Sequence, residues 1–289
     1  MVELTPPTFA SIGRLEREDV SSAAALSAAV GWNQNEEDWV RLVELHPEGA
    51  FAARVDGELV GTTTLVSYGD ALAWLGMVIV HPERRGGGIG SALVDTALAG
   101  APSRVIGLDA TDLGAPLYER RGFAGVATID RWSGVLRAEP ARRHHASVRS
   151  AGAGDVDRIA RFDSALSGLD RVALLSQLAS EAGTTLVFAE RGGTVAGFAA
   201  LRSGRERPHV GPIVVFDDEA LHVVINELAS RMAGEHVFLD AVRQEHTSGR
   251  LEAFGLQVAR SLRRMTRPAA PEAAMMRPEL VAAMGLEWG

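Results

Sequence analysis

Apolar and polar positions recur along the chain in two patterns, one with helical spacing and one typical of strands. Residues 21–30, 36–45 and 89–100 have helical spacing, with apolar side chains in the last segment at 89, 93, 94, 97 and 98. Residues 51–68 are interrupted at Asp56-Gly57, a pair that favours a tight turn between two strands. Residues 71–80 and 104–110 are typical of buried strands, and a short helix (114–122) and a last strand (126–136) follow. This order predicts an α/β (α+β) fold.

The second part of the chain repeats this plan. The stretch FAARVDGELVG (51–61) matches VFAERGGTVAG (187–197), and GLDA (107–110) matches FLDA (238–241). LGMVIV (75–80) resembles VGPIVV (210–215), and LYERRGF (117–123) resembles RLEAFGL (250–256). Between the two parts, residues 138–146 are polar, contain proline and lack periodicity, so we interpret them as a linker. We therefore expect two domains of similar fold, residues 1–137 and 147–289.

Composition narrows the classes of function. The 289 residues contain no cysteine, which excludes disulfides, thiolate metal sites and a cysteine nucleophile. The formal net charge is −8, which argues against broad nucleic-acid binding. No signal peptide and no apolar stretch of membrane-spanning length is visible, so we expect a cytoplasmic protein without a membrane partner. His144 and His145 stand in the linker without partners at ligand spacing, so no metal site is expected.

The segment HPERRGGGIG (81–90) places two arginines and four glycines between a strand and a helix. Unpaired backbone N–H groups at the helix start, together with the helix dipole, favour an anion, and glycines allow phosphate to approach the backbone. A dinucleotide-binding fingerprint is disfavoured because the glycine pattern differs and five polar residues separate the strand from the first glycine. A Walker loop is excluded because Gly-Lys-Ser/Thr is absent. The segment therefore predicts a phosphate or pyrophosphate site.

Arg85-x-x-Gly88-x-Gly90 resembles motif A of the GNAT superfamily of acyl-CoA-dependent N-acetyltransferases, and LYERRGF resembles the family's closing Y-x-x-x-G-F element. The resemblance covers residues 8–135 well and 147–289 as fold only. The stretches GWNQNEEDW, GLDRVALL, GPIVV and GLEWG are similar to a tandem type with an intact first and a degenerate second domain. The resemblance implies two GNAT-like domains, each with a mixed, mostly antiparallel twisted sheet flanked by helices.

The resemblance also implies acetyl-CoA as co-substrate and assigns residues to it. The strand backbone would pair with the pantetheine arm, an N–H near Val78 would polarise the thioester carbonyl, and the loop would hold the pyrophosphate. The implied cofactor-binding residues are Met77, Val78, Val80, Arg85, Gly86, Gly87, Gly88, Ile89, Gly90 and Ser91. Tyr118 matches the family's general acid, since a neutral phenol can donate a proton to the departing thiolate.

The general base is left open, because residues 71–80 contain no acid where many GNAT relatives keep a glutamate. Asp109 at the end of the next strand is one candidate, and Glu37 and Asp38 on an early helix are others. The acceptor cleft is expected to include Trp32, Asn33, Gln34 and Asp38, with Trp32 and Trp39 on one face if the helix extends that far.

The predicted function is acetyl transfer from acetyl-CoA to a primary amine of a small molecule, by a monomer or homodimer. Two alternatives stay open: a protein or peptide N-acetyltransferase, and a catalytically silent acyl-CoA-binding sensor. The second half has FDDEALHVV where the first has HPERRGGGIGSALV, so only the first half is expected to bind acetyl-CoA. The second half would shape the acceptor pocket, with Arg171 or Arg202 able to reach an anionic part of the substrate.

Overall fold

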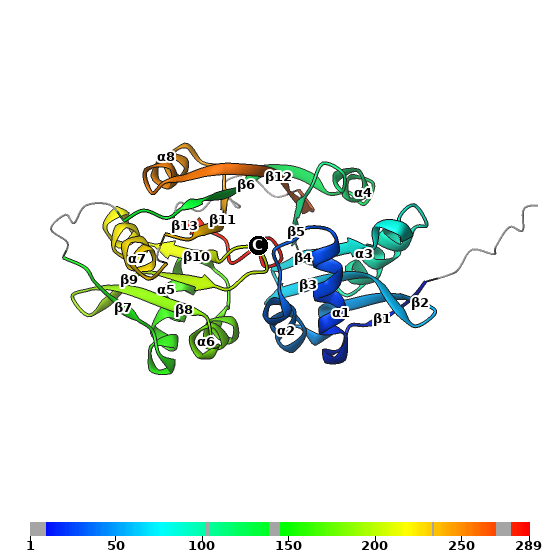
Figure 1. Ribbon diagram of the computed structural model, residues 1–289, viewed down its shortest axis with the longest axis horizontal. Helices are drawn as coiled ribbons and strands as arrows, with labels where there is room; N and C mark the ends of the chain where they lie inside the picture. Colours follow the sequence, from blue (N-terminus) through cyan, green and yellow to red (C-terminus); the bar gives the residue numbers. More distant parts are fainter. Residues whose placement is uncertain (1–9, 102–104, 139–144, 233, 270–278) are drawn as a thin grey trace, which may run out of the picture.

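The two halves of the chain have the same order of α-helices and strands in the computed structural model, which describes residues 10–101, 105–138, 145–232, 234–269 and 279–289 (Figure 1). The elements of the first half are β1 (Ser11–Arg14), η1 (Arg17–Asp19), α1 (Val20–Ala29), α2 (Glu36–Leu45), η2 (Pro47–Gly49), β2 (Ala50–Val55), β3 (Glu58–Tyr68), β4 (Leu72–Val80), η3 (Pro82–Arg84), α3 (Ile89–Ala99), β5 (Val105–Ala110), α4 (Ala115–Glu119) and β6 (Ala124–Val135).

The second half repeats the α-helices and strands in the same order and adds one strand, and its described residues contain no counterparts of η2 and η3. Its elements are β7 (Ser147–Ser150), η4 (Ala153–Asp155), α5 (Val156–Ser167), α6 (Val172–Ser180), β8 (Thr185–Arg191), β9 (Thr194–Arg202), β10 (His209–Val215), α7 (Asp218–Arg231), β11 (His236–Val242), α8 (Glu245–Ala253), β12 (Leu256–Arg267) and β13 (Leu280–Ala282). The predicted turn between β2 and β3 is confirmed, with Asp56 and Gly57 both at positive φ. Most of the predicted linker, residues 139–144, lies outside the described residues.

The strands of both halves form one continuous sheet, because the halves exchange their last strands. The order is β1-β2-β3-β4-β5-β12-β6-β11-β10-β9-β8-β7, and β13 pairs with β10. Thus β12 of the second half lies beside β5 of the first, and β6 of the first half lies beside β11 of the second. All pairings are antiparallel except β4–β5 and β10–β11. Figure 1 shows β6 and β12 crossing together from one half to the other. Division of the chain near residue 138 into two fragments would therefore separate β6 from β11 and β12 from β5.

A buried Arg–Asp pair lies on each side of this exchange. Arg264 of β12 donates to both carboxylate oxygens of Asp109 on β5, at 2.9 Å each. Arg131 of β6 donates to both oxygens of Asp240 on β11, at 2.7 Å each. Asp109 and Asp240 are the equivalent aspartates of the GLDA and FLDA repeats. Two equivalent Arg–Asp pairs, one in each half of the repeat, therefore fix the last strand of one half to the sheet of the other.

The halves also share a hydrophobic core on one face of the sheet. One cluster contains side chains of α1 and α2 together with side chains of α5 and α6, and α2 contacts α6 at the junction. Separate clusters lie under the helices α3 and α4 of the first half and under α7 and α8 of the second. Among the described residues, no helix is long and apolar enough to cross a membrane.

The end of the chain runs from the second half into the first. β13 pairs with β10, and the backbone N–H of Ala283 then donates to the Asp240 carbonyl of β11. Beyond this point the chain enters the first half, where Trp74 Nε1 donates to the Leu286 carbonyl at 2.9 Å and the Tyr68 hydroxyl donates to the Trp288 carbonyl at 2.7 Å. The C-terminal residue consequently lies between the two halves (Figure 1).

Candidate active site

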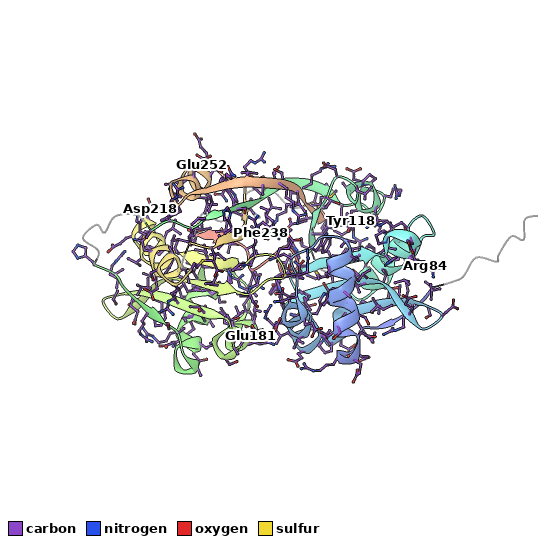
Figure 2. All side chains as sticks on the ribbon, viewed as in Figure 1. Arg84, Tyr118, Glu181, Asp218, Phe238 and Glu252 are labelled. Atoms are coloured by element: carbon purple, nitrogen blue, oxygen red, sulfur yellow. The ribbon has the colours of Figure 1, made fainter. Side chains whose placement is uncertain are left out.

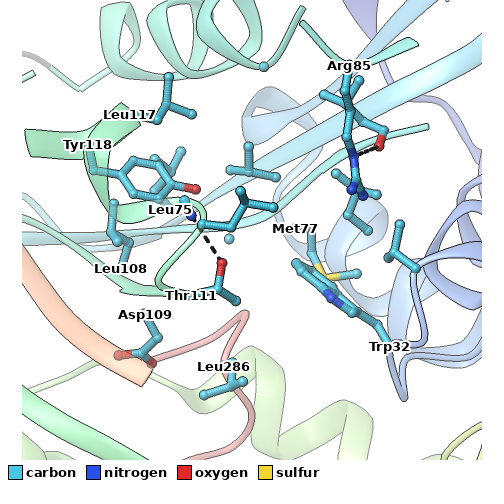
Figure 3. A pocket seen from close by; sticks show the side chains of 18 of the residues that line it. Trp32, Leu75, Met77, Arg85, Leu108, Asp109, Thr111, Leu117, Tyr118 and Leu286 are labelled. Atoms are coloured by element: carbon cyan, nitrogen blue, oxygen red, sulfur yellow. Dashed lines mark hydrogen bonds between the residues drawn. The ribbon is translucent and has the colours of Figure 1, made fainter. Parts of the chain in front are cut away.

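A cavity of about 750 Å³ opens in the first half where β4 and β5 separate. The parallel pairing of these strands extends only from Leu72–Val105 to Trp74–Gly107, although β4 continues to Val80 and β5 to Ala110. Residues 75–80 and 108–109 line the two sides of the opening. The unpaired part of β4 thus presents its backbone to the cavity, and Figure 3 shows the side chains around it.

The glycine loop forms one end of this cavity. Arg84, Arg85, Gly86 and residues 88–91 line it, whereas Gly87 belongs to the loop but not to the lining. Gly86 and Gly88 have φ of +84° and +83°, a conformation that favours glycine, and a Cβ on either would meet nothing within 4 Å. α3 begins at Ile89, and its first internal bond runs from Ala92 N–H to Gly88 carbonyl. The open space, the free helix N–H groups and the arginines fit a pyrophosphate.

A bulge in β4 lies beside the loop. Thr62 pairs with Ile79 and Thr64 pairs with Gly76, so β4 has one more residue than β3 between these pairs. Met77 takes φ of +50° there, and the Thr62 hydroxyl donates to its carbonyl at 2.8 Å. The sequence-predicted residues Met77, Val78 and Val80 all line the cavity. The bulge interrupts the β3–β4 ladder at the place where the backbone N–H of Val78 was predicted to polarise a carbonyl.

Tyr118 lines the same cavity from α4. Its side chain is buried, its ring packs edge-on against Phe123, and Figure 3 shows its hydroxyl directed into the cavity near Leu75. Burial raises the pKa of the Tyr118 phenol to about 12, against a smaller opposing effect of Arg121. The phenol is therefore protonated at neutral pH and can act only as a proton donor.

Asp109 reaches the cavity wall, but its carboxylate serves the strand exchange. Both oxygens accept hydrogen bonds from Arg264, and the side chain has no exposed surface. Burial raises the pKa of Asp109, while the Arg264 guanidinium opposes that rise. Its counterpart Asp240 makes the same bond in the half that lacks the glycine loop. The geometry therefore corrects the prediction of Asp109 as general base: its lone pairs are directed at an arginine.

The segment 32–35 divides between the cavity and the second half. Trp32 and Gln34 line the cavity. Asn33 instead donates to the Arg207 carbonyl at 2.9 Å and accepts from the Glu206 and Arg207 N–H groups, so it joins the halves. Asn35 caps α2 by accepting from the Asp38 N–H, and the Asp38 carboxylate accepts from the Asn35 N–H in return. Asp38 is buried between Arg41 and Arg202, which hold its pKa below the usual range against the effect of burial. Asn33 and Asp38 are thus corrected from acceptor contacts to structural residues.

Three further predictions from the sequence are wrong for simple packing reasons. α2 begins at Glu36, so Trp32 is not on the helix of Trp39, which lies in the core with its indole N–H on Ser27. Arg171 is buried in an ion pair with Asp163. Arg202 is buried against Asp38 and His209. Neither arginine lines the cavity.

The second half contributes to the cavity through residues that the sequence did not single out. Arg260 and Leu262 reach it from β12, and Leu286 and Glu287 reach it from the C-terminal segment. The exchanged strand and the final residues thus line the cavity together with β4. The stretch GLEWG resembles tandem GNAT proteins, but the sequence indicates no role for it in the site. Its neighbouring residues contain no signal of a contact with residues more than two hundred positions earlier.

The second half closes its own equivalent of this opening. β10 and β11 pair only at His209–Phe238, and β13 then pairs with β10 where the gap would widen. At the start of α7, Asp217 caps the Ala220 N–H, and Arg191 binds Asp217 and Glu219. Acidic side chains therefore occupy the helix start at which the first half has glycines, and they would repel a phosphate.

Comparisons with known proteins agree with this geometry. Residues 17–123 match the model of the acetyltransferase (GNAT) family, and residues 159–276 match a model of an acetyltransferase (GNAT) domain. Holothin acyltransferase from a Pseudoalteromonas species is 26% identical over 182 residues, which are 63% of this chain and 61%, or less than two thirds, of that protein. YitH of Bacillus subtilis, described as an uncharacterized N-acetyltransferase, is 27% identical over 238 residues, covering 81% of this chain and 83% of YitH.

Solved structures show the same fold over nearly the whole chain. A Pyrococcus horikoshii protein aligns with a TM-score of 0.82 and 18% identity, covering 100% of this chain and 99% of that one. A tandem GNAT protein from the clavulanic acid biosynthesis pathway aligns with a TM-score of 0.65 and 18% identity, covering 89% and 98%. The family models on both halves lead to one conclusion: the chain belongs to the acetyltransferase (GNAT) family and has a GNAT domain in each half.

Proposed function

We propose that this protein transfers an acetyl group from acetyl-CoA to the primary amine of a small molecule, using one active site in its first half. The observation that carries the proposal is the cavity between β4 and β5, which connects the glycine loop at the start of α3 to the Tyr118 hydroxyl. An anion site at one end and a buried proton donor at the other suit a ligand with a pyrophosphate and a distant reactive thioester.

The chain's own groups have distinct tasks in this reaction. Acetyl-CoA supplies the thioester carbonyl and the thiol leaving group. Residues 85–91 hold the pyrophosphate through backbone N–H groups, and the unpaired edge of β4 aligns the pantetheine arm beside Met77 and Val78. A thiol has an ordinary pKa of about 8.5, but the buried surroundings that raise the Tyr118 pKa also disfavour a free thiolate, so proton donation from Tyr118 assists departure of sulfur.

The acceptor is expected to enter on the side formed by both halves. Trp32 and Leu286 supply apolar surface there, and Gln34, Glu287 and Arg260 supply polar groups. This mixture suits a compact amine with an apolar body. A pocket completed by β12 and the C-terminal segment also gives the second half a task, since its own opening is closed by β13.

The proposal is tested by binding and by an acceptor screen. Isothermal titration calorimetry should give one acetyl-CoA site per chain. Release of CoA is then measured with tyramine, tryptamine, glucosamine and spermidine, and with two octapeptides that begin with alanine or serine. Turnover of one or more small amines with inactive peptides is the expected result. Turnover of peptides alone would favour a protein acetyltransferase, and tight binding without any turnover would favour a sensor.

A further inference from the structure

Glu287 of the second half lines the acetyl-transfer cavity of the first half, and it also lines a smaller cavity beside Asp38, Arg202 and His209. Glu287 belongs to the C-terminal segment of the second half, lines the cavity, and is 97% buried, with 3% of its surface exposed. Gln34, which lines the same cavity, donates from Nε2 to Glu287 Oε2 at 2.7 Å. A carboxylate is thus brought by a distant segment to a cavity wall and oriented there by a hydrogen bond.

The backbone of β4 is shaped to admit this segment. A Cβ on Gly76 would come within 2.9 Å of Glu287 Cα, and a Cβ on Gly285 would come within 2.4 Å of Glu287 Oε1. Gly76 directly precedes Met77 at the β4 bulge. The carboxyl-bearing residue therefore packs on the part of β4 that faces the cavity, where the strand itself contains no acid.

The segment on both sides of Glu287 is held firmly. The Leu286 carbonyl accepts from Trp74 and the Trp288 carbonyl accepts from Tyr68, and the Trp288 ring is buried in the core shared by the halves. These contacts fix the backbone of Glu287 independently of its side chain. Such a fixed backbone is what a reacting group needs, because catalysis depends on positioning.

The surroundings of Glu287 also suit proton transfer. Burial raises the pKa of the Glu287 carboxyl, Asp38 adds to the rise, and Arg202 opposes it. A raised pKa makes a carboxylate a stronger base near neutral pH. Asp109, by contrast, has both oxygens bonded to Arg264.

We propose that Glu287 is the general base of the acetyl-transfer reaction, supplied to the first half by the end of the second. The inference rests on the proposed function. The ammonium form of the acceptor loses one proton to Glu287, which passes it to solvent. The freed lone pair of nitrogen then forms the N–C bond to the acetyl carbon, while the π pair of the carbonyl moves onto its oxygen. Nitrogen then loses a second proton to Glu287. The electron pair on oxygen re-forms the C=O bond as the C–S bond breaks with its electron pair on sulfur, which takes the Tyr118 proton. Transfer of the second proton from Glu287 to Tyr118 through solvent restores both groups, and one proton is released per turnover.

The test compares Glu287→Gln with the wild-type chain on the amine of the panel that the wild type acetylates fastest. The substituted amide keeps the shape of the side chain and an oxygen that can accept from Gln34. We expect kcat to fall by about 10²–10⁴-fold, the usual contribution of a general base, with little change in the dissociation constant of acetyl-CoA. In the variant, log kcat/KM should rise with unit slope up to the pKa of the amine, whereas the wild type should keep its activity down to the pKa of Glu287.

Two further variants separate catalysis from folding. Glu181→Gln removes another second-half carboxylate that reaches the first half, since Glu181 pairs with Arg41 at the junction away from the cavity (Figure 2). It should retain wild-type kcat and pH profile. Glu287→Asp keeps the charge and should recover part of the activity at neutral pH.

The outcomes distinguish the two proposals. If Glu287→Gln turns over the amine as fast as the wild type, or has the same pH profile, the role of Glu287 is overturned and the proposed function is not. A wild-type chain that acetylates none of the amines would overturn the proposed function and the assignment of Glu287 with it. Equal losses in Glu287→Gln and Glu181→Gln would mean that a carboxylate at the junction, and not a base in the cavity, is what activity requires.

Discussion

Replacement of Asp240 by asparagine should destabilise the whole molecule, because it breaks the buried pair that fixes β6 to β11. The Arg131 and Asp240 side chains are 5% and 0% exposed, and two hydrogen bonds of 2.7 Å join them. His209 Nε2 lies 3.1 Å from the same carboxylate. Removal of one partner of a buried pair leaves the other charge uncompensated and typically costs about 3–5 kcal/mol. That is a large share of the roughly 5–15 kcal/mol by which proteins are stable.

The matched control is Asp95→Asn. Arg121 also binds both oxygens of Asp95, at 2.6 and 2.8 Å, but the Asp95 side chain is 62% exposed. An exposed pair contributes about 0–1 kcal/mol, so this variant should stay close to the wild type. At roughly 2–3 °C per kcal/mol for a large chain, Tm should fall by about 6–15 °C for Asp240→Asn and by no more than about 2–3 °C for Asp95→Asn.

The measurement is thermal unfolding by circular dichroism at pH 7, repeated at lower pH. Arg131 holds the pKa of Asp240 well below its usual range, although burial opposes this. The carboxylate therefore contributes stability above the unfolded-state pKa of about 4, and this contribution is lost as pH falls below that value. The gap between wild type and Asp240→Asn should be constant from pH 8 to 5 and shrink below pH 4. Equal Tm values for Asp240→Asn and Asp95→Asn would refute the buried exchange of strands.

Three other variants test the site. Tyr118→Phe should lower kcat by about 10²–10⁴-fold while the dissociation constant of acetyl-CoA, measured by calorimetry, stays within about twofold; a kcat near that of the wild type would assign Tyr118 to packing. Gly88→Val should abolish detectable acetyl-CoA binding, because its Cβ enters the open space of the loop. The control Gly57→Val, at a similar φ of +84° in the β2–β3 turn, should bind acetyl-CoA normally. Equal losses of binding in the two variants would attribute the effect to backbone strain alone. Asp109→Asn should keep the wild-type pH profile of kcat/KM in a transfer assay, and loss of the acidic limb would restore Asp109 as the base.

Sequence patterns were sufficient for the elements of each half but not for the way the halves join. The repeat of GLDA and FLDA indicates two equivalent strands, and the structure places them at β5 and β11. The same repeat makes β6 and β12 equivalent. Either strand can therefore pair with the edge strand of either half, and the same face of the strand is buried in both cases. Local alternation therefore predicts the strands and leaves their exchange undetermined.

The cofactor side of the site was predictable because its signal is local. Gly86, Gly88 and Arg85 lie within a few residues of one another, and their chemistry depends on backbone conformation at one turn. The acceptor side depends on contacts between distant segments, such as Gln34 with Glu287. Asn33 and Asp38 show the same limit, since a polar side chain beside a helix start is equally suited to capping, to joining two halves and to binding a substrate.

Hydrogen–deuterium exchange with and without acetyl-CoA tests the central claim most directly, namely that the opening between β4 and β5 binds the co-substrate and its counterpart in the second half does not. Acetyl-CoA should slow exchange in peptides covering residues 76–91, which include the unpaired edge of β4 and the glycine loop. Peptides covering residues 210–221, where β13 pairs with β10 and acidic side chains begin α7, should exchange at unchanged rates. Protection of residues 210–221, or no protection of residues 76–91, would contradict the account.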